Sequence, residues 1–256
     1  MELNKIRAVI TGGVSGLGFA VAERFVADGG KVVLLDVNED KAGEAVASLG
    51  EDNAKFFRVD VTSEDDVANV IEQARDWLGG LNVAVSCAGI LGAGRVLGRE
   101  GPMKLDQFAG TVMVNLVGSF NVAKAAANLM QNNEPGEDNE RGVIINTASV
   151  AAYEGQIGQA AYSASKGGVV GMTLPMAREF TRFGVRVMTI APGVFHTPMA
   201  DVMPEEVQRA LGESIPFPKR MGKPEEFANL AAHIVENRYF NGTTIRLDGA
   251  VRLEPK

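Results

Sequence analysis

A tyrosine, a lysine and a serine near the middle of the chain have the types and spacing of a proton-transfer site. Tyr162 and Lys166 are four residues apart, so on a helix they lie on one face, with about 5–6 Å between their Cβ atoms. A free tyrosine has a pKa near 10, and a nearby positive charge is expected to lower this pKa. Ser149 precedes the tyrosine and could hold the oxygen of an alcohol or a carbonyl. The three residues predict general acid–base chemistry on such an oxygen.

A glycine-rich segment near the N-terminus adds a second signal, which is needed because Tyr-x-x-x-Lys also occurs by chance on ordinary helices. The apolar run 7–11 is expected to form a buried strand, and 19–27 has the pattern of a helix. Between them stand Gly12, Gly16 and Gly18. Glycines at such a junction permit a tight turn and let backbone amides approach a pyrophosphate at the helix N-terminus. The segment predicts a dinucleotide site, and a glycine-rich turn without a ligand is the alternative.

The next apolar run, 31–36, is expected to form a second buried strand, and it ends in an acid, Asp36. A carboxylate at this position can accept hydrogen bonds from the hydroxyls of an adenosine ribose, and it would repel a 2′-phosphate. The nearest following cation is Lys41. The sequence therefore predicts a preference for NAD over NADP, although Asp36 could instead be a turn or capping residue.

Composition and charge narrow the class of protein. The 256 residues are 46% apolar and 22% charged, which is ordinary for a folded globular domain. The net charge of −7 argues against a surface that binds nucleic acid. Cys87 is the only cysteine, so no disulfide can form within the chain, and a reducing compartment, the cytoplasm, is expected. No apolar run is long enough to span a bilayer, and the two histidines share no metal-ligand spacing with Cys87. Because the first strand is expected to begin within the first ten residues, we expect no leader before it.

Strand-like and helix-like patterns alternate along the whole chain, which indicates a parallel sheet covered on both faces. We expect a single α/β domain over residues 1–256, a Rossmann-type doubly wound parallel sheet of seven strands with helices on both faces. The segment 194–218 contains four prolines and several apolar side chains, and it is expected to form a lid over the substrate. Further strands are predicted at 54–59, 81–85, 143–146, 185–190 and 243–247, and further helices at 39–49, 67–78, 105–130, 160–180 and 224–237.

In combination these motifs resemble the short-chain dehydrogenase/reductase family, and the resemblance runs over the whole chain in the right order. It implies that Ser149, Tyr162 and Lys166 are catalytic and that Asn115 holds a water in a proton relay with Lys166. It also implies that Asp60 and Val61 contact the adenine of NAD, and that Thr197 contacts its nicotinamide carboxamide. The full set of cofactor-binding residues predicted in this way is Thr11, Gly12, Ser15, Gly16, Leu17, Gly18, Asp36, Asp60, Val61, Cys87, Ala88, Gly89, Tyr162, Lys166, Pro192, Gly193, Phe195 and Thr197.

Within that family, the stretches 142–173, 216–218 and 241–250 are most similar to members that act on 3-hydroxyacyl-CoA. The resemblance implies that the chain interconverts 3-hydroxyacyl-CoA and 3-oxoacyl-CoA, a step of fatty acid metabolism. Other substrates on the same chemistry remain open: a 3-oxoacyl-carrier protein, a steroid or a sugar alcohol. A catalytically silent NAD-binding subunit is the alternative of another class. The residues predicted to contact substrate are Ser149, Gln159, Tyr162, Phe195 and Phe217.

Two further expectations concern a departure from the family pattern and the assembly. Where the family has Asn-Asn-Ala-Gly, this chain has Ser86-Cys87-Ala88-Gly89, so the support that two amide side chains would give is missing. Helices 105–130 and 160–180 are apolar on more than one face, which predicts that they pack between identical chains, as a homotetramer. Cations that flank the site are candidates for binding the CoA nucleotide: Arg95, Arg99, Lys219 and Arg220.

Overall fold

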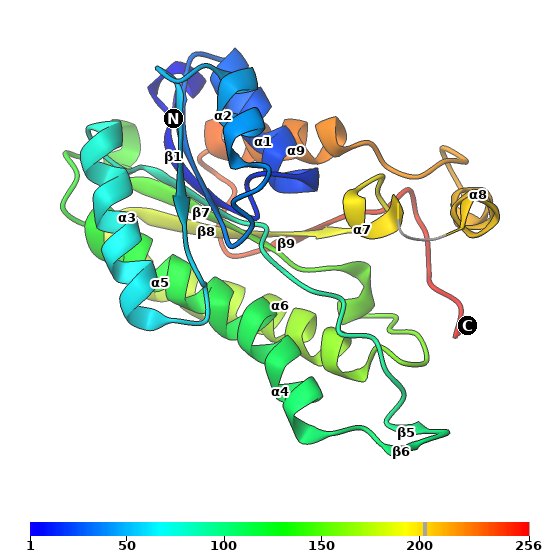
Figure 1. The fold of residues 1–256 in the computed structure, drawn as a ribbon. Helices are drawn as coiled ribbons and strands as arrows, with labels where there is room; N and C mark the ends of the chain where they lie inside the picture. The colour runs from blue at the N-terminus through cyan, green and yellow to red at the C-terminus, as the bar shows by residue number, and fades with distance from the viewer. Residues whose placement is uncertain (202–203, 256) are drawn as a thin grey trace.

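A seven-stranded parallel sheet forms the centre of the molecule, in the computed structural model that describes residues 1–201 and 204–255. The strands lie in the order β3-β2-β1-β4-β7-β8-β9, and each pairs in parallel with its neighbours. The predicted Rossmann-type sheet is thereby confirmed (Figure 1). The strands are β1 (Arg7–Thr11), β2 (Lys31–Asp36), β3 (Ala54–Arg58), β4 (Val83–Ser86), β7 (Gly142–Thr147), β8 (Val185–Pro192) and β9 (Thr244–Leu247).

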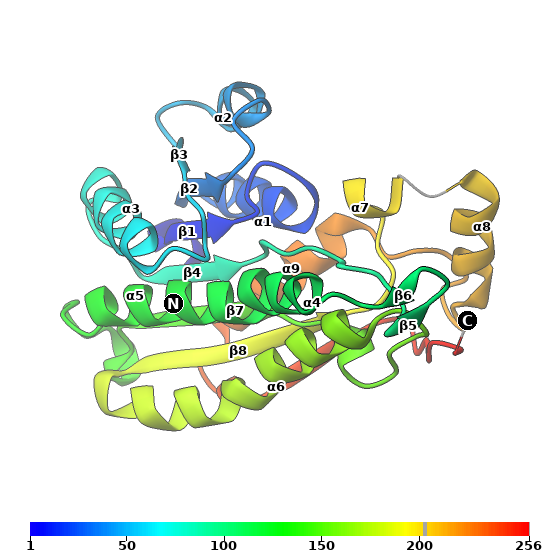
Figure 2. The same ribbon diagram turned by 60° about the horizontal axis from the view of Figure 1, so that its bottom comes forward.

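Helices cover both faces of this sheet (Figures 1 and 2). One face carries α1 and α9, which pack against each other, and the other carries α3, α5 and α6. The helices are α1 (Gly16–Ala27), α2 (Ala42–Leu49), α3 (Glu64–Leu78), α4 (Leu105–Val112), α5 (Gly118–Met130), α6 (Ala160–Phe180), α7 (Pro198–Asp201), α8 (Glu205–Ser214) and α9 (Pro224–Glu236).

The central strands consist almost wholly of apolar residues because both of their faces are buried. In β1, Ile10 packs into the hydrophobic cluster under α1 and α9, and Val9 packs into the cluster under α3 and α5. This alternation is the normal result of a strand whose successive side chains point to opposite faces. Along the sequence it appears as a short continuous apolar run, which is why the strands could be predicted.

The long helix predicted over 105–130 is divided into α4, one wider π-type turn (Met113–Val117) and α5. In this turn the amide of Gly118 donates to the carbonyl oxygen of Met113. Gly118 packs so closely that a Cβ there would lie 2.6 Å from a methyl of Val61, so only glycine fits without displacement. The periodicity of apolar residues could not show this irregularity, because one extra residue in a turn hardly changes the pattern. Asn115 lies within the turn.

Two other segments contain more regular structure than predicted. The loop 91–104 includes a short hairpin made of β5 (Leu97–Gly98) and β6 (Gly101–Pro102). The segment 194–218 contains α7 and α8, and Val202 and Met203 within it lie outside the described residues. Both segments lie beyond the carboxyl ends of the strands, on the side where an open parallel sheet binds its ligands (Figure 2).

Candidate active site

A cavity of about 560 Å³ lies at the carboxyl ends of the strands, where β1 and β4 connect to opposite halves of the sheet. Such a reversal of strand order leaves a crevice between the diverging connections. Residues from both of the predicted motifs meet there. Of the predicted site residues, those that line the cavity are Gly12, Ser15, Gly16, Leu17, Gly18, Asp36, Asp60, Val61, Cys87, Ala88, Gly89, Ser149, Gln159, Tyr162, Lys166, Pro192, Gly193, Phe195 and Thr197.

The turn between β1 and α1 has a backbone that only glycine permits. Gly12 has φ of +64°, and a Cβ on it would lie 2.8 Å from the amide nitrogen of Ala88. A Cβ on Gly18 would lie 2.3 Å from the carbonyl oxygen of Gly12. The close packing brings the N-terminus of α1 against the cavity, where free backbone amides and the helix dipole favour an anion. These residues fit the pyrophosphate of a dinucleotide.

Two acids stand at the other end of the cavity. Asp36 ends β2 and is half-buried, and one of its oxygens accepts a hydrogen bond from the Asn38 amide at 3.1 Å. Its neighbour across the sheet is Arg58 on β3, whose guanidinium forms an ion pair of 3.2 Å with Glu39. Asp60 accepts from both the amide and the hydroxyl of Thr62, and these hydrogen bonds hold its pKa below the usual value.

Ser149, Tyr162 and Lys166 converge from two elements. Ser149 follows β7 and caps a short 3₁₀ turn, where its oxygen accepts from the amide of Ala151 at 3.1 Å. Its hydroxyl also interacts with the Tyr162 phenol. Tyr162 and Lys166 lie one helical turn apart on α6, with the lysine Nζ 5.7 Å from the centre of the tyrosine ring. Lys166 is buried, and its Nζ donates to the carbonyl oxygen of Thr147 at 2.8 Å.

The predicted lowering of the Tyr162 pKa is wrong for this structure, in which that pKa is raised. Burial raises the Tyr162 pKa, and the hydrogen bond from Ser149 only partly opposes this effect. Burial also lowers the pKa of Lys166, to about 8. The low-polarity surroundings disfavour both charged forms, and spacing along a helix says nothing of that desolvation. Tyr162 is therefore a protonated acid in the protein by itself, next to a lysine that titrates slightly above neutral pH.

Asn115 lies behind the cavity wall and is fully buried. Its side-chain oxygen accepts from the amide of Ile90 at 2.8 Å, and its nitrogen donates to the carbonyl oxygen of Ile90 and to the hydroxyl of Ser165. A Cβ on Gly89 would lie 3.1 Å from the Asn115 oxygen and 3.6 Å from Lys166 Nζ, so both side chains converge on this glycine. The structure thus brings Asn115 close to Lys166, and its part in a proton relay stays a prediction.

Two other predicted residues do not line the cavity. Thr11 lies behind the glycine turn, where its hydroxyl oxygen accepts from the Ala88 amide at 3.2 Å. Phe217 lies away from the cavity with its side chain 82% exposed, so its predicted contact with substrate requires a different arrangement of this segment. Other residues of 194–218 do cover the cavity, namely Val194, Pro198, Ala200 and Leu211.

Thr147 is a site residue that sequence reasoning missed. Its carbonyl oxygen holds Lys166, and its hydroxyl lies 3.4 Å from the thiol sulfur of Cys87, a thiol whose pKa burial raises to about 11. One indication of this role is present in the sequence: Thr147 directly follows a predicted strand and stands two residues before Ser149. In the strand before Cys87, among the described residues, the side chains of Ser86 and its strand neighbour Asn146 are buried without a hydrogen-bond partner.

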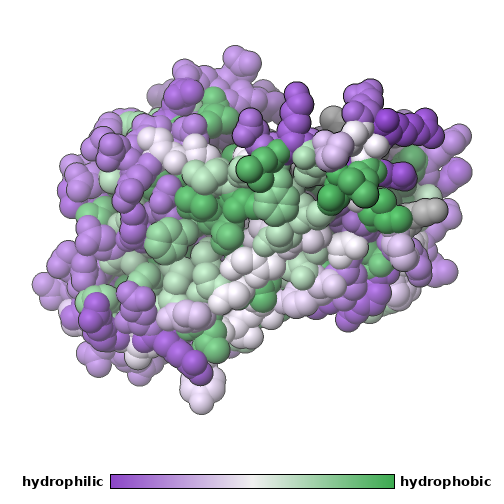
Figure 3. Space-filling view, turned by 90° about the horizontal axis from the view of Figure 1, so that it is seen from below, coloured by the Kyte–Doolittle hydropathy of each residue, from purple (hydrophilic) through white to green (hydrophobic). Residues whose placement is uncertain are grey.

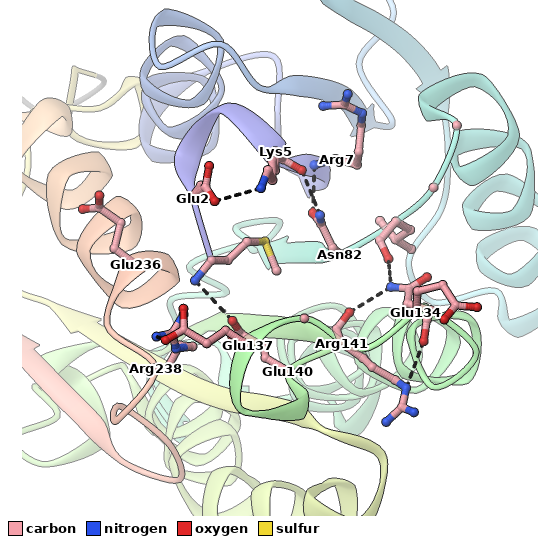
Figure 4. A pocket seen from close by; sticks show the side chains of 16 residues that line it. Glu2, Lys5, Arg7, Asn82, Glu134, Glu137, Glu140, Arg141, Glu236 and Arg238 are labelled. Carbon is pink, nitrogen blue, oxygen red and sulfur yellow. Dashed lines mark hydrogen bonds and ion pairs between the residues drawn. The ribbon is translucent and has the colours of Figure 1, made fainter.

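A second cavity of about 620 Å³ lies at the opposite, amino-terminal edge of the sheet (Figure 4). Its charged groups are largely paired with one another: Lys5 with Glu2 at 2.8 Å, and Arg238 with Glu137 at 2.7 Å. Arg141 donates to the carbonyl oxygen of Asn133 at 2.9 Å. This cavity has no tyrosine or serine among its lining residues, so the acid–base chemistry belongs to the first cavity.

Among the described residues, no group of three or more histidine, cysteine, aspartate or glutamate side chains could hold a metal ion. No helix in the described part of the chain is long and apolar enough to cross a membrane.

The fold and the site together define a nucleotide-dependent oxidoreductase, and comparison with known proteins places it in a family. A model of the short chain dehydrogenase family matches residues 7–208, and the chain belongs to this family. It is 52% identical over 250 residues to human 3-hydroxyacyl-CoA dehydrogenase type-2, covering 97% of this chain and 95% of the relative. It is 33% identical over 254 residues to ipsdienol dehydrogenase from Ips pini, covering 95% of this chain and 96% of the relative.

A solved structure is similar over nearly the same range. The crystal structure of 3-hydroxyacyl-CoA dehydrogenase type-2 from Mycobacterium avium superposes with a TM-score of 0.90 at 43% sequence identity, and the match covers 97% of this chain and 96% of that one. Membership of the family implies a nucleotide cofactor and a small-molecule substrate.

Proposed function

We propose that this protein is an NAD-dependent dehydrogenase that interconverts 3-hydroxyacyl-CoA and 3-oxoacyl-CoA. One observation supports the proposal most directly. Ser149, Tyr162 and Lys166 line the same cavity as Gly12, Gly16 and Gly18, the glycines at the N-terminus of α1. The choice of an acyl-CoA substrate is supported by the relatives of this name at about half identity over nearly the whole chain.

The mechanism follows from the atoms at the site. The hydroxyls of Ser149 and Tyr162 hold the substrate oxygen between them. In reduction Tyr162 donates its phenolic proton to this oxygen, and burial keeps that proton on the phenol until then. In oxidation the Tyr162 phenolate takes the proton of the substrate hydroxyl, and the neighbouring Lys166 ammonium stabilises this phenolate before the transfer. NAD, when bound, supplies the hydride chemistry.

The chain's residues also have the arrangement to hold NAD. The backbone of Gly12, Gly16 and Gly18 would take the pyrophosphate, and Asp36 the hydroxyls of the adenosine ribose. Asp60 and Val61 would contact the adenine, and Thr197 the carboxamide. Thr11 would support this site from behind through its hydrogen bond to Ala88.

Substituting Asp36→Ala is expected to weaken NAD binding and to relax the discrimination against NADP. The carboxylate provides the hydrogen bonds to the ribose and repels a 2′-phosphate, so both effects disappear together. Dissociation constants of NADH and NADPH, measured by the change in their fluorescence, test the expectation. Asp40→Ala is the matched control, because Asp40 is exposed and does not line the cavity. Equal affinity of the unmodified protein for both cofactors would contradict this role of Asp36.

The proposed function is tested directly by turnover of acetoacetyl-CoA with NADH, followed by the loss of NADH absorbance. The expected result is steady oxidation of NADH that depends on both compounds. The pantetheine thioester without the nucleotide should react with a lower kcat/KM, because Arg95, Arg99 and Lys219 are exposed cations that could attract the phosphates of the nucleotide. Arg220, the fourth predicted cation, is already paired with Glu226 through two hydrogen bonds of 2.8 and 2.9 Å. No turnover of acetoacetyl-CoA would refute the proposal.

We also propose that residues 1–256 form one catalytic domain with 194–218 as its lid, and that the protein acts in the cytoplasm. The lid is supported by the residues that this segment contributes to the cavity. The cytoplasmic location is supported by the single, buried thiol, which needs no oxidising compartment.

A homotetramer completes the proposal. Figure 3 views the face that carries α5 and α6, and hydrophobic side chains gather across its middle. On this face Met113, Phe120 and Leu174 are 40%, 44% and 42% exposed, which is unusual for large apolar residues on neighbouring helices. Other apolar side chains of these helices, such as Val122 and Val169, are instead buried against the sheet. The C-terminal segment 247–253 is the proposed second contact between chains.

Light scattering at micromolar concentration is expected to give about four times the 27.1 kDa of one chain. Phe120→Asp should lower this mass, because it places a charge in the centre of the proposed contact. Tyr239→Asp is the control, since Tyr239 is fully exposed elsewhere on the surface. A mass of one chain for the unmodified protein would refute the assembly.

A further inference from the structure

The segment 251–255 lies along the loop that connects Ser149 to α6. The amide of Ile157 donates to the carbonyl oxygen of Pro255 at 3.0 Å, and the Gln156 side chain donates to the carbonyl oxygen of Glu254, also at 3.0 Å. Leu253, the residue before Glu254, lines the active-site cavity, as does Gln156. The segment is therefore part of the cavity wall although it is about a hundred residues away in sequence.

A cluster of four charged residues fastens this segment to the same loop. Arg246, on β9, binds Glu154 through two hydrogen bonds of 2.7 and 2.8 Å and also pairs with Asp248 at 2.7 Å. Arg252 pairs with Asp248 at 3.1 Å and with Glu154 at 3.6 Å. A bidentate pair fixes orientation as well as distance, and several charges in one network hold better than an isolated surface pair. The cluster thus connects β9 to the loop, through Glu154, and to the C-terminal segment, through Arg252.

The contact has a consequence for Gln159, at the start of α6. The amide of Gln156 donates to the Gln159 side-chain oxygen at 3.0 Å. A backbone amide can only donate, so the oxygen of Gln159 faces Gln156 and its nitrogen, with two donors, is turned away. In the described part of the chain this nitrogen has no hydrogen-bond partner, and Gln159 lines the cavity with Ser149 and Tyr162. A donor is thus available beside the two hydroxyls that would hold the reacting oxygen.

We propose that the segment 251–255 is a specificity wall: Leu253 limits the length of the acyl chain, and the attached loop presents the Gln159 amide to the thioester carbonyl. The inference rests on the proposed function, because a 3-oxoacyl thioester has a second carbonyl close to the reacting one. Ser149 and Tyr162 bind the reacting oxygen, Gln159 donates to the second oxygen, and the chain beyond the 3-carbon runs toward Leu253. Leu253 and Gln159 are binding residues; Glu154 and Arg246 are positioning residues.

The wall is tested with 3-oxoacyl-CoA substrates of four and ten carbons. Leu253→Ala is expected to shift the ratio of their kcat/KM values about tenfold or more toward the longer chain, because a single methylene in an apolar pocket changes such ratios by about 10–200-fold. Leu253→Trp should shift the ratio the other way. Leu105→Ala is the matched control, since Leu105 is 77% exposed and does not line the cavity. Ratios for the two Leu253 variants within twofold of the parent would overturn the inference.

A measurement that needs no substrate distinguishes a failure of this inference from a failure of the proposed function. In hydrogen exchange of the intact protein, the Ile157 amide should be protected, and Glu154→Gln, which removes one charge from the cluster, should increase its exchange rate. NADH affinity should stay within twofold, so a change in KM for the acyl-CoA at an unchanged cofactor affinity identifies a positioning role. If no acyl-CoA reacts but Ile157 behaves as expected, the substrate proposal fails and the contact stands. An unprotected Ile157 in the parent protein overturns the inference whatever the substrate.

Discussion

Tyr162→Phe should lower kcat for acetoacetyl-CoA reduction by about 10²–10⁴-fold, the range that general acid–base groups contribute. The phenyl ring fills the same space on α6 but carries no proton, so the loss is one of chemistry and not of structure. The partner groups remain in place, because Lys166 is held by the Thr147 carbonyl and Ser149 by the Ala151 amide. The measurement is single-turnover oxidation of NADH by a saturating concentration of acetoacetyl-CoA.

The control for this variant is its affinity for NADH, which should lie within about threefold of the parent value. An unchanged affinity with a large loss of kcat is the signature of a group that acts only during the reaction. A Tyr162→Phe protein that retains turnover within threefold of the parent would remove the tyrosine from the mechanism. The proton would then have to come from another cavity residue.

The pH dependence of the reaction rate should follow Lys166 and Tyr162, the two catalytic residues whose pKa values are shifted. The lowered pKa of Lys166, about 8, means that its positive charge is present below that pH and lost above it. Tyr162, whose pKa is raised, keeps its proton over the same range. Reduction needs the protonated phenol, whereas oxidation needs a phenolate beside a charged lysine. The two directions should therefore differ in their pH profiles.

The regular parts of the fold could be predicted from the sequence because they depend on local and short-range signals. Buried parallel strands are continuous apolar runs, as in β1 and β2. The glycine-rich turn between β1 and α1 could also be predicted, because glycine is the usual residue where the backbone needs a positive φ, as at Gly12. These features follow from the backbone and from the identity of one or two residues.

Features that depend on tertiary packing could not be predicted. Whether the pKa of Tyr162 is raised or lowered depends on how much water reaches the phenol, and the spacing to Lys166 does not contain that information. Gly118, which follows the π-type turn at Asn115, packs closely against Val61, and a contact between segments so far apart leaves no local pattern. The contact of Leu253 with the cavity joins segments about a hundred residues apart, and no local pattern connects them.

Gly18→Ala is expected to have the second large effect, on cofactor binding and on stability together. Its Cβ would lie 2.3 Å from the Gly12 carbonyl oxygen and 3.2 Å from that of Thr11, both backbone atoms that cannot rotate away. Strain of this kind typically costs about 1–3 kcal/mol. The loop can relieve it only by moving, and a moved loop no longer holds its amides toward the pyrophosphate. NADH affinity should therefore fall by roughly 5–150-fold if all of this strain energy opposes the binding of NADH.

The chain offers a matched control in Gly43, on α2, where an added Cβ would meet nothing within 4 Å. Gly43→Ala should leave NADH affinity unchanged and raise the free energy of unfolding by about 0.5–1 kcal/mol, because alanine loses less backbone entropy in a helix. Fluorescence titration with NADH and urea unfolding, applied to both variants, separate packing from helix propensity. If Gly18→Ala binds NADH as tightly as Gly43→Ala does, the turn tolerates a side chain and cannot be the close-packed cradle that a dinucleotide requires.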